Sequence, residues 1–267
     1  MRGFRRRRDV GLLDLDDVER RLRPITRRYL GVRPVPIAQV VGTEGRAGSF
    51  TRDFKPRQNF SRDRLRSLQT AFPDGAFPPI VAVKLGATYF VIDGHHRVAL
   101  ARRQGAETID AELTEFVTRV PLPAGADMLE VVLRELERVF LEESGLAEAR
   151  GGIRLSASKP AVYLELLENL QVHGYHLMRE RGTVLDEAEI AADWYDRVYS
   201  PTIAAIDRER LGARYHGLPD ADLFLLLHQR RREGFPSCGC PPLEETVSTV
   251  LVDAAGKGRR TAFLRRR

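Results

Sequence analysis

The chain has 267 residues, of which 43% are hydrophobic, so it is long and apolar enough for one large or two ordinary folded domains, and global disorder is excluded. No stretch approaches the roughly 20 apolar residues that cross a bilayer. The basic start MRGFRRRRDV lacks the apolar run of a secretory signal. The two cysteines, Cys238 and Cys240, are too few for a disulfide scaffold. These features predict a soluble cytoplasmic protein.

The net charge of +6 is unevenly distributed along the chain. Residues 1–8 carry five arginines and residues 257–267 carry six basic residues, and neither segment contains an acid. Residues 33–120 have 13 basic and 9 acidic residues, whereas residues 121–256 have 14 basic and 23 acidic ones. Two interpretations of the basic ends stay open. They are solubilising disordered tails, or they hold nucleic-acid phosphates without sequence specificity.

The first expected element is an amphipathic helix over residues 12–30, with acids near its start and arginines near its end. Pro24 should kink this helix or split it. Three further features follow in order: a strand at 33–42, a glycine-rich loop at 42–49, and a helix that begins at Ser61 and ends near Phe72, before a loop at 73–79.

A compact α/β unit is expected over about residues 31–118. Two short apolar runs flank Gly86-Ala87 and predict a β-hairpin, and an alternating run later in the chain predicts a further strand. The expected order is a strand at 80–85, a strand at 88–93, a helix from about His95 to Gly105, and a strand at 108–116.

The second half of the chain is strongly helical beyond the linker PLPAG at 121–125. Asp186 and Glu189 have the spacing of a capping box, Ser158-Lys159-Pro160 reads as a helix start, and Pro201 should break or bend a helix. Helices are expected at 127–143, 158–180, 186–199 and 220–233. From about residue 236 glycine, proline and arginine dominate, which predicts little order. The predicted domains are a basic tail and helix at 1–30, an α/β domain at 31–120, a helical domain at 121–235 and a tail at 236–267.

The sharpest chemical signal is Asp93-Gly94-His95-His96-Arg97, between a predicted strand and a predicted helix. Glycine lets the backbone approach a ligand closely, and the free N–H groups of the first helical turn favour an anion. Arg97 adds a forked donor suited to phosphate, and the two histidines add donors. Asp93 suits orienting a histidine, holding a divalent metal or accepting a substrate hydroxyl proton. The alternative is a capped turn with surface histidines.

The stretch FVIDGHHRVALARRQG resembles the signature of the ParB/sulfiredoxin-like superfamily, over about residues 33–117. The resemblance implies nucleotide phosphates on the loop 94–97, with CTP in ParB proteins and ATP in sulfiredoxins. His95 replaces the sulfiredoxin cysteine, and His95 and His96 replace the glutamate and arginines of ParB. The DGHHR loop is most similar to the SerK-like free serine kinases, which transfer phosphate from a nucleotide to serine.

This resemblance implies an α/β N-terminal domain plus an all-α C-terminal domain, because DWYDRVYSP and DADLFLLL resemble an uncharacterised helical domain that follows ParB-like domains in some bacterial proteins. The expected ligands are a nucleotide (ATP, ADP or CTP) and Mg²⁺. The candidate catalytic residues are Asp93, His96 and Glu44. The candidate phosphate-binding residues are Gly94, His95, His96 and Arg97, together with a basic loop that contains Arg52, Lys55 and Arg57. The alternative for this loop is that its basic side chains are solvated and bind no ligand.

The helical half offers weaker signals. His173 and His176 have the spacing to share a metal, but packed or surface histidines are the usual outcome, so no metal site is predicted. A third ligand would come from Asp193, Asp196, Asp222 or His228. The aromatic residues Trp194, Tyr195 and Tyr199 are expected in the helical core.

The leading hypothesis is a nucleotide-binding protein that uses residues 93–97, with phosphotransfer to a small hydroxyl substrate as a further step. The alternative is a non-enzymatic ParB-like DNA-associated or regulatory protein, which lacks a clear helix-turn-helix and would use its arginine-rich ends. An interaction scaffold is a third hypothesis. The oligomeric state stays open.

Overall fold

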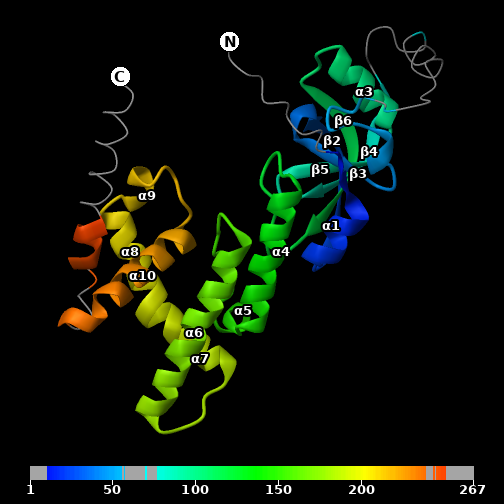
Figure 1. Ribbon diagram of the computed structural model, residues 1–267. Coiled ribbons are helices and arrows are strands. Elements are labelled where there is room, and N and C mark those ends of the chain that lie inside the picture. The colour runs from blue at the N-terminus through cyan, green and yellow to red at the C-terminus, as the bar shows by residue number, and fades with distance from the viewer. Residues whose placement is uncertain are drawn as a thin grey trace, which may run out of the picture. The chain divides into compact units, whose positions relative to one another are not determined.

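The computed structural model describes residues 11–55, 57, 70, 77–238, 243 and 245–250. The chain divides into two compact units, Met1–Glu135 and Leu136–Arg267, drawn in Figure 1. The division falls within one helix, α4 (Met128–Glu143). Among the described helices, none has the length and apolar character needed to span a bilayer.

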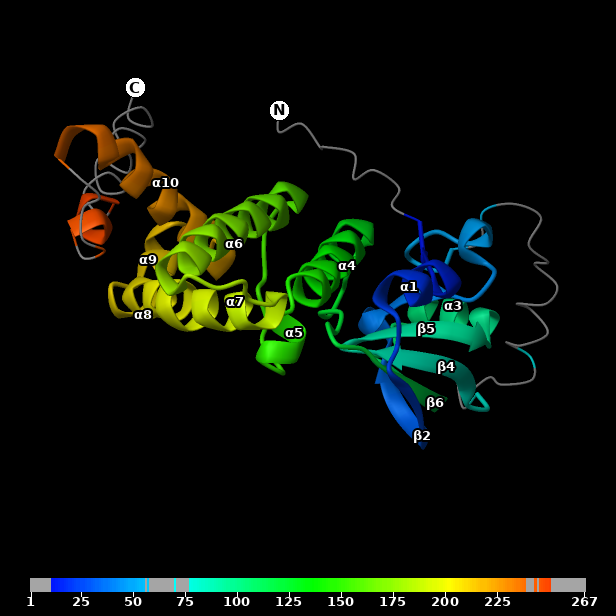
Figure 2. The same cartoon turned by 90° about the horizontal axis from the view of Figure 1, so that it is seen from below.

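The first unit is built on a six-stranded mixed sheet with the order β1-β3-β5-β4-β6-β2. Figure 2 shows β5, β4, β6 and β2 side by side. β3 runs parallel to β1 and β5, and β4 runs parallel to β6, whereas the β4–β5 and β2–β6 pairs are antiparallel. The strands are β1 (Leu13–Asp14), β2 (Thr26–Pro36), β3 (Val40–Thr43), β4 (Ile80–Leu85), β5 (Thr88–Asp93) and β6 (Thr108–Val117).

The expected helix over residues 12–30 is wrong beyond residue 22. Helix α1 (Leu15–Leu22) ends at Arg23, whose φ of 47° is left-handed, just before Pro24. The arginine-rich stretch that follows is strand β2, because it pairs with β6 along its whole length. The expected strand at 33–42 is likewise interrupted by the 3-10 turn Ile37–Gln39. Pairing between distant strands decided this region against its local helical pattern.

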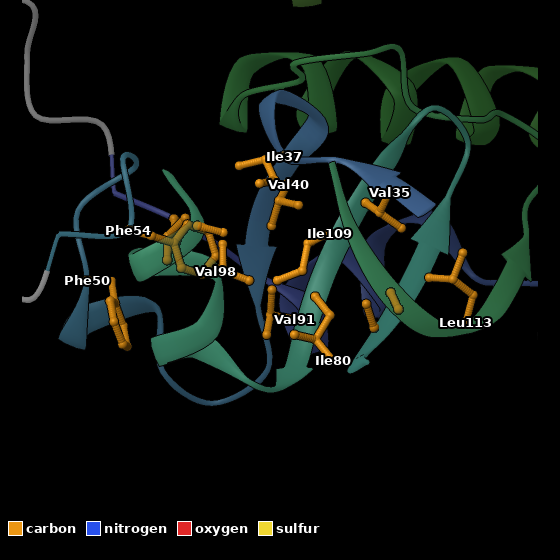
Figure 3. Close-up of a cluster of buried hydrophobic side chains, with 14 residues drawn as sticks. Val35, Ile37, Val40, Phe50, Phe54, Ile80, Val91, Val98, Ile109 and Leu113 are labelled. Carbon is orange, nitrogen blue, oxygen red and sulfur yellow. The ribbon is translucent and has the colours of Figure 1, made fainter. Parts of the chain in front are cut away.

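Apolar side chains fill both faces of the sheet. On one face Val98 of helix α3 (His95–Arg103) packs with strand residues and with Phe50 and Phe54, as Figure 3 shows. Ala101 of α3 belongs to the same cluster. On the other face α1 and the start of α4 contribute to a second cluster, whose members are Leu13, Leu15, Val18, Leu22, Val41, Val83, Leu85, Phe90, Phe116, Leu122, Ala126 and Val131. The sheet is therefore covered on both sides, which holds the ends of its central strands in place.

The predicted hairpin, helix and strand around the motif are confirmed. β4 and β5 pair through a turn at Gly86-Ala87, α3 begins at His95, and β6 covers the alternating run. The predicted helix at 61–72 and the basic segments 1–8 and 257–267 lie outside the described residues, apart from residue 70.

The second unit is helical, as expected from its sequence. Asp186 and Glu189 form the predicted capping box. The expected interruption at Pro201 is a π-helical turn, Tyr195–Tyr199, after which the chain stays helical with proline in the first turn of α8. The further helices are α5 (Leu146–Ala149), α6 (Pro160–Arg181), α7 (Glu187–Trp194), α8 (Ser200–Arg208), α9 (Leu211–Arg214) and α10 (Asp220–Cys238).

Two expectations for this unit need correction. Ser158 does not cap α6, because its Oγ is bonded to Asp222. The expectation of little order from residue 236 is wrong for residues 245–250, which are helical and bury Val247 and Val250 in a cluster with Leu223 and Leu227 of α10. The aromatic core is as predicted for Trp194 and Tyr199, which are 0% and 4% exposed.

Candidate functional site

The turn between β5 and α3 carries the predicted motif. Gly94 has a φ of 97°, and a Cβ at this position would lie 2.5 Å from Cγ2 of the buried Ile80. No side chain caps α3 at Gly94. The first N–H groups of a helix have no acceptor within it, and the helix dipole is positive there. The turn therefore offers a backbone edge that favours an anion, at a position that only glycine fits.

The loop after β3 lies beside this turn. β3 and β5 are parallel, with Thr43 opposite Val91, so both strands end at the same edge of the sheet. The backbone N–H of Glu44 donates to the carbonyl oxygen of Val91 at 3.1 Å. Both Glu44 and Asp93 are exposed. The structure thus brings the two candidate acids to one edge, although they are 49 positions apart in the sequence.

His95 points into the protein and not toward solvent. It is 3% exposed, its Nε2 is hydrogen-bonded to Oγ1 of Thr43, and its ring stacks on Phe50 with centroids 5.6 Å apart. Burial lowers the pKa of His95 to about 4, and the charge of Arg46 acts in the same direction. His95 is therefore neutral at neutral pH and joins α3 to the end of β3. Its neighbour His96 is half-exposed.

Arg97 is bound to the protein itself. Its guanidinium donates to the carbonyl oxygens of Pro78 and Pro79 at 2.8 and 2.6 Å and to the Asp93 carboxylate at 2.7 Å. The Arg97 side chain is 16% exposed and that of Asp93 is 74% exposed. Arg97 thus fastens the segment before β4 to the turn, and it orients the carboxylate of Asp93.

The basic loop at residues 52–57 is also held by backbone carbonyls. Arg52 donates to the carbonyl of Gly125 at 2.7 Å, and Arg57 donates to that of Phe50 at 3.2 Å. The side chain of Lys55 is exposed, and within the described part of the chain it makes no hydrogen bond or ion pair. Of the three predicted cations of this loop, Lys55 alone is thus available to a ligand among the described residues.

Two arginines of this region were missed by sequence reasoning. The exposed Arg46 lies near enough to His95 to lower its pKa, and among the described residues its side chain has no hydrogen-bond or ion-pair partner. Arg102 donates to the carbonyls of Arg52, Ile37 and Val40 at 2.8 to 2.9 Å, and so holds two loops against α3. Arg46 follows Glu44 by two positions in the loop GTEGR. A cation in the same loop as the candidate acid was the sequence signal that could have identified it.

A pocket lies along α3, one turn beyond the motif. Its volume is about 460 Å³, within the range of roughly 300–1,000 Å³ that is usual for small-molecule sites. Its walls are partly apolar and partly cationic, and are formed by Asp53, Phe54, Lys55, Ala99, Leu100, Arg102 and Arg103.

The histidines of the helical unit do not assemble a metal site. His173 contacts the carboxylate of Asp193 at 2.7 Å, whereas His228 lies 3.4 Å from Asn169 and Asp222 holds Ser158. Among the described residues no group of three or more histidine, cysteine, aspartate or glutamate side chains has a geometry that could hold a metal ion.

Comparisons with known proteins bear on the first unit. Residues 50–124 match the family model of the ParB N-terminal domain, and no curated protein matches the chain. Sulfiredoxin from Arabidopsis thaliana is 16% identical, with a TM-score of 0.25, over 31% of this chain and 82% of that one. Truncated ParB from Caulobacter crescentus, solved with CTP-gamma-S, is 18% identical, with a TM-score of 0.25, over 68% and 84%.

Residues 50–124 are therefore similar to the ParB N-terminal domain, as the family model shows and the resemblance of the motif implied. The similarity to the SerK-like branch and the nature of the helical region stay predictions.

Proposed function

We propose that the edge formed by the β5–α3 turn and the 44–46 loop binds the phosphates of a nucleotide. The observation that carries this proposal is the glycine-capped start of α3, where Gly94 leaves the first N–H groups uncovered by any capping side chain. The exposed side chains of Arg46 and Lys55 supply positive charges that form no ion pair with an acid among the described residues. The pocket of about 460 Å³ along α3 gives room for the nucleoside.

The roles of the motif residues follow from their contacts. Gly94, His96 and the backbone of α3 contact the phosphates. His95 and Arg97 position the turn, His95 through Thr43 and Arg97 through the carbonyl oxygen of Pro78. Glu44 and Asp93 are exposed oxygen ligands at the same edge, and Mg²⁺ is usually held by one or two carboxylates together with substrate phosphates. Asp93 therefore fits Mg²⁺, which would neutralise phosphate charge there, and Glu44 is left as a proton acceptor.

A phosphotransfer step is the finer proposal. A substrate hydroxyl oxygen attacks the terminal phosphorus, the bond from phosphorus to the bridging oxygen breaks, and the nucleotide leaves with that electron pair. The hydroxyl proton passes to the carboxylate of Glu44, which is exposed and forms no ion pair with any cation among the described residues. Asp93, oriented by Arg97, is the candidate Mg²⁺ ligand.

Binding is tested by calorimetry of the full chain with ATP, ADP, CTP and GTP in the presence of Mg²⁺. Arg46→Gln is expected to weaken the binding of the preferred nucleotide about tenfold, as the loss of one charge-assisted phosphate contact implies. Arg33→Gln is the matched control, because Arg33 is an exposed cation of the same unit on the edge strand β2. No binding of any nucleotide, or equal losses in both variants, would refute the proposal.

Turnover is tested separately with serine and other free hydroxy amino acids as acceptors. Glu44→Gln is expected to abolish transfer while leaving nucleotide affinity within about twofold, because a proton acceptor adds little to ground-state binding. Asp93→Asn should lower transfer and the Mg²⁺ dependence of binding together. Binding without turnover by the unaltered chain would leave a nucleotide-binding module and remove the kinase proposal.

The DNA-associated alternative rests on the arginine-rich segments, which lie outside the described residues. Caulobacter crescentus ParB has also been solved with the centromeric parS site, at 14% identity and a TM-score of 0.21 to this chain. Removal of residues 1–8 and 257–267 should abolish DNA binding under this alternative and leave nucleotide binding unchanged under the main proposal.

A further inference from the structure

A groove lies between α6 and α10 of the second unit, both labelled in Figure 1. Its volume is about 810 Å³, large enough for several side chains of a docked segment. From α6 it is lined by Glu165, Glu168, Asn169 and Val172, and from α10 mainly by His228, Arg232 and Glu233.

The groove is acidic. Glu165 and Glu168 are exposed, and their carboxylates form no ion pair or hydrogen bond with any residue that the structure describes. Glu233 accepts from Arg230 at 3.2 Å, so its charge is partly cancelled. Arg232 is the cation in the lining. A cationic ligand therefore gains two carboxylates without displacing an existing partner.

The floor of the groove adds no positive charge. The indole N–H of Trp194 donates to Oδ1 of Asn169 at 2.8 Å, which turns the amide nitrogen of Asn169 toward Nδ1 of His228 at 3.4 Å. Burial lowers the pKa of His228 to about 4, and Arg231 acts in the same direction. His228 is therefore neutral at neutral pH, and the groove keeps its acidic character.

An exposed apolar stripe runs along α6 beside the groove. Leu164, Val172 and Tyr175 are 72%, 53% and 56% exposed, and their spacing of eight and three residues places them on one side of the helix. A surface with an apolar stripe next to unpaired acids suits a segment that combines apolar and basic side chains.

We propose that residues 257–267 of this same chain dock into the acidic groove. The segment reads KGRRTAFLRRR, with six basic residues, no acid, and Phe263-Leu264 as an apolar pair for the stripe. The basic side chains pair with Glu165 and Glu168. Because the segment is covalently attached, its effective concentration at the groove is in the millimolar range, so modest contacts suffice.

The segment is long enough to reach. Val250 is buried in a cluster with Leu223 and Leu227 on one face of α10. The groove is lined by Leu225, Gln229 and Arg232, which lie on the opposite face of this helix, so the path runs around the helix as well as along it. The six residues from Leu223 to Gln229, in the middle of the groove, rise about 9 Å, and half the circumference of a helix is about 17 Å, which gives a path of about 19 Å over its surface. The seven residues from Val250 to Lys257 cover up to about 23 Å when extended.

The test is photo-cross-linking in the full chain, with p-benzoylphenylalanine placed at Val172 and the products mapped by mass spectrometry. Cross-links to residues 257–267 of the same molecule are expected. Val184, which is 87% exposed in the same unit, is the control position and should give few of them. Mixing ¹⁵N-labelled and unlabelled chains separates contacts within one chain from contacts between two.

Neutralising the two free acids gives the second readout. Glu165→Gln with Glu168→Gln should lower the cross-link yield about fivefold, since each screened ion pair contributes less than about 1 kcal/mol. Glu107→Gln with Asp110→Asn makes the same change of net charge on the first unit and should leave the yield unchanged. Cross-links only to other segments, only between chains, or with equal yield in both double variants would overturn the proposal.

Discussion

Arginines are used differently around the β5–α3 turn and in the helical unit. Along α3, Arg52 and Arg102 donate to backbone carbonyls, and Arg97 divides its donors between two carbonyls and Asp93. In the helical unit the arginines meet carboxylates: Arg138 meets Glu142, Arg150 meets Asp196, Arg154 meets Glu137 and Arg181 meets Asp193.

The difference affects what each region attracts. A carbonyl satisfies the donors of a guanidinium without cancelling its charge, whereas a carboxylate cancels the charge as well. The first arrangement fastens loops and leaves the charges of Arg52 and Arg102 uncancelled beside α3. In the second arrangement the arginines are paired with acids, while Glu165 and Glu168 form no ion pair with any residue that the structure describes. The two regions thus favour anionic and cationic ligands, respectively.

The largest expected effect comes from breaking the turn itself. Gly94→Ala should destabilise the first unit by about 3 kcal/mol, because the left-handed φ is strained for alanine and its Cβ would overlap the buried Ile80. Gly105→Ala is the matched control at the other end of α3, with a φ of +75° and open space around a Cβ, and should cost only about 1 kcal/mol. Urea unfolding measures both, and equal costs would contradict the steric argument.

A smaller effect is expected from removing a carbonyl-bound arginine. Arg102→Met keeps the apolar stem but leaves the carbonyls of Arg52, Ile37 and Val40 without this donor. We expect a loss of about 2 kcal/mol that is independent of salt, since neutral acceptors are involved. The same denaturation at low and high salt checks this, and a strongly salt-dependent loss would show that charge pairing dominates here too.

The buried His95 predicts a pH dependence of stability. Its folded pKa of about 4 lies below the ordinary value of 6.5, so the unfolded chain binds a proton more readily as the pH falls between these values. Stability is therefore lost as the pH falls from about 6.5 to about 4, with about 2 kcal/mol lost by pH 5. His95→Gln should flatten this part of the profile. The exposed His176→Gln should leave it unchanged, and an unaltered slope in both variants would contradict the assignment.

The smallest effect is expected at an exposed ion pair between an arginine and an aspartate of the helical unit. Arg150 and Asp196 have side chains that are 40% and 50% exposed, and solvent screens such pairs. Arg150→Gln should leave stability nearly unchanged at moderate salt. Thermal unfolding of the variant should overlay that of the unaltered chain, whereas a shift of several degrees would mean that this pair organises the π-helical turn beside it.

The sequence by itself determined the elements whose patterns are local. The β4–β5 hairpin, the glycine start of α3, the alternating strand β6 and the Asp186–Glu189 capping box depend on neighbours a few residues apart, so they were readable before the structure. The α/β-then-helical order followed from the same patterns. The sequence also identified residues 93–97 as a candidate site and Glu44 as a candidate acid, through residue chemistry and family resemblance.

Tertiary structure alone decided the rest. Residues 26–30 look helical in isolation and become the first part of strand β2, because β6 supplies partners more than 80 residues away. Whether a polar side chain of the motif faces solvent or core depends on what packs against it. Thr43 and Phe50 turn His95 inward, and the carbonyls of Pro78 and Pro79 occupy Arg97, while Arg46 stays exposed. These partners come from distant segments, and no pattern within DGHHR encodes their positions.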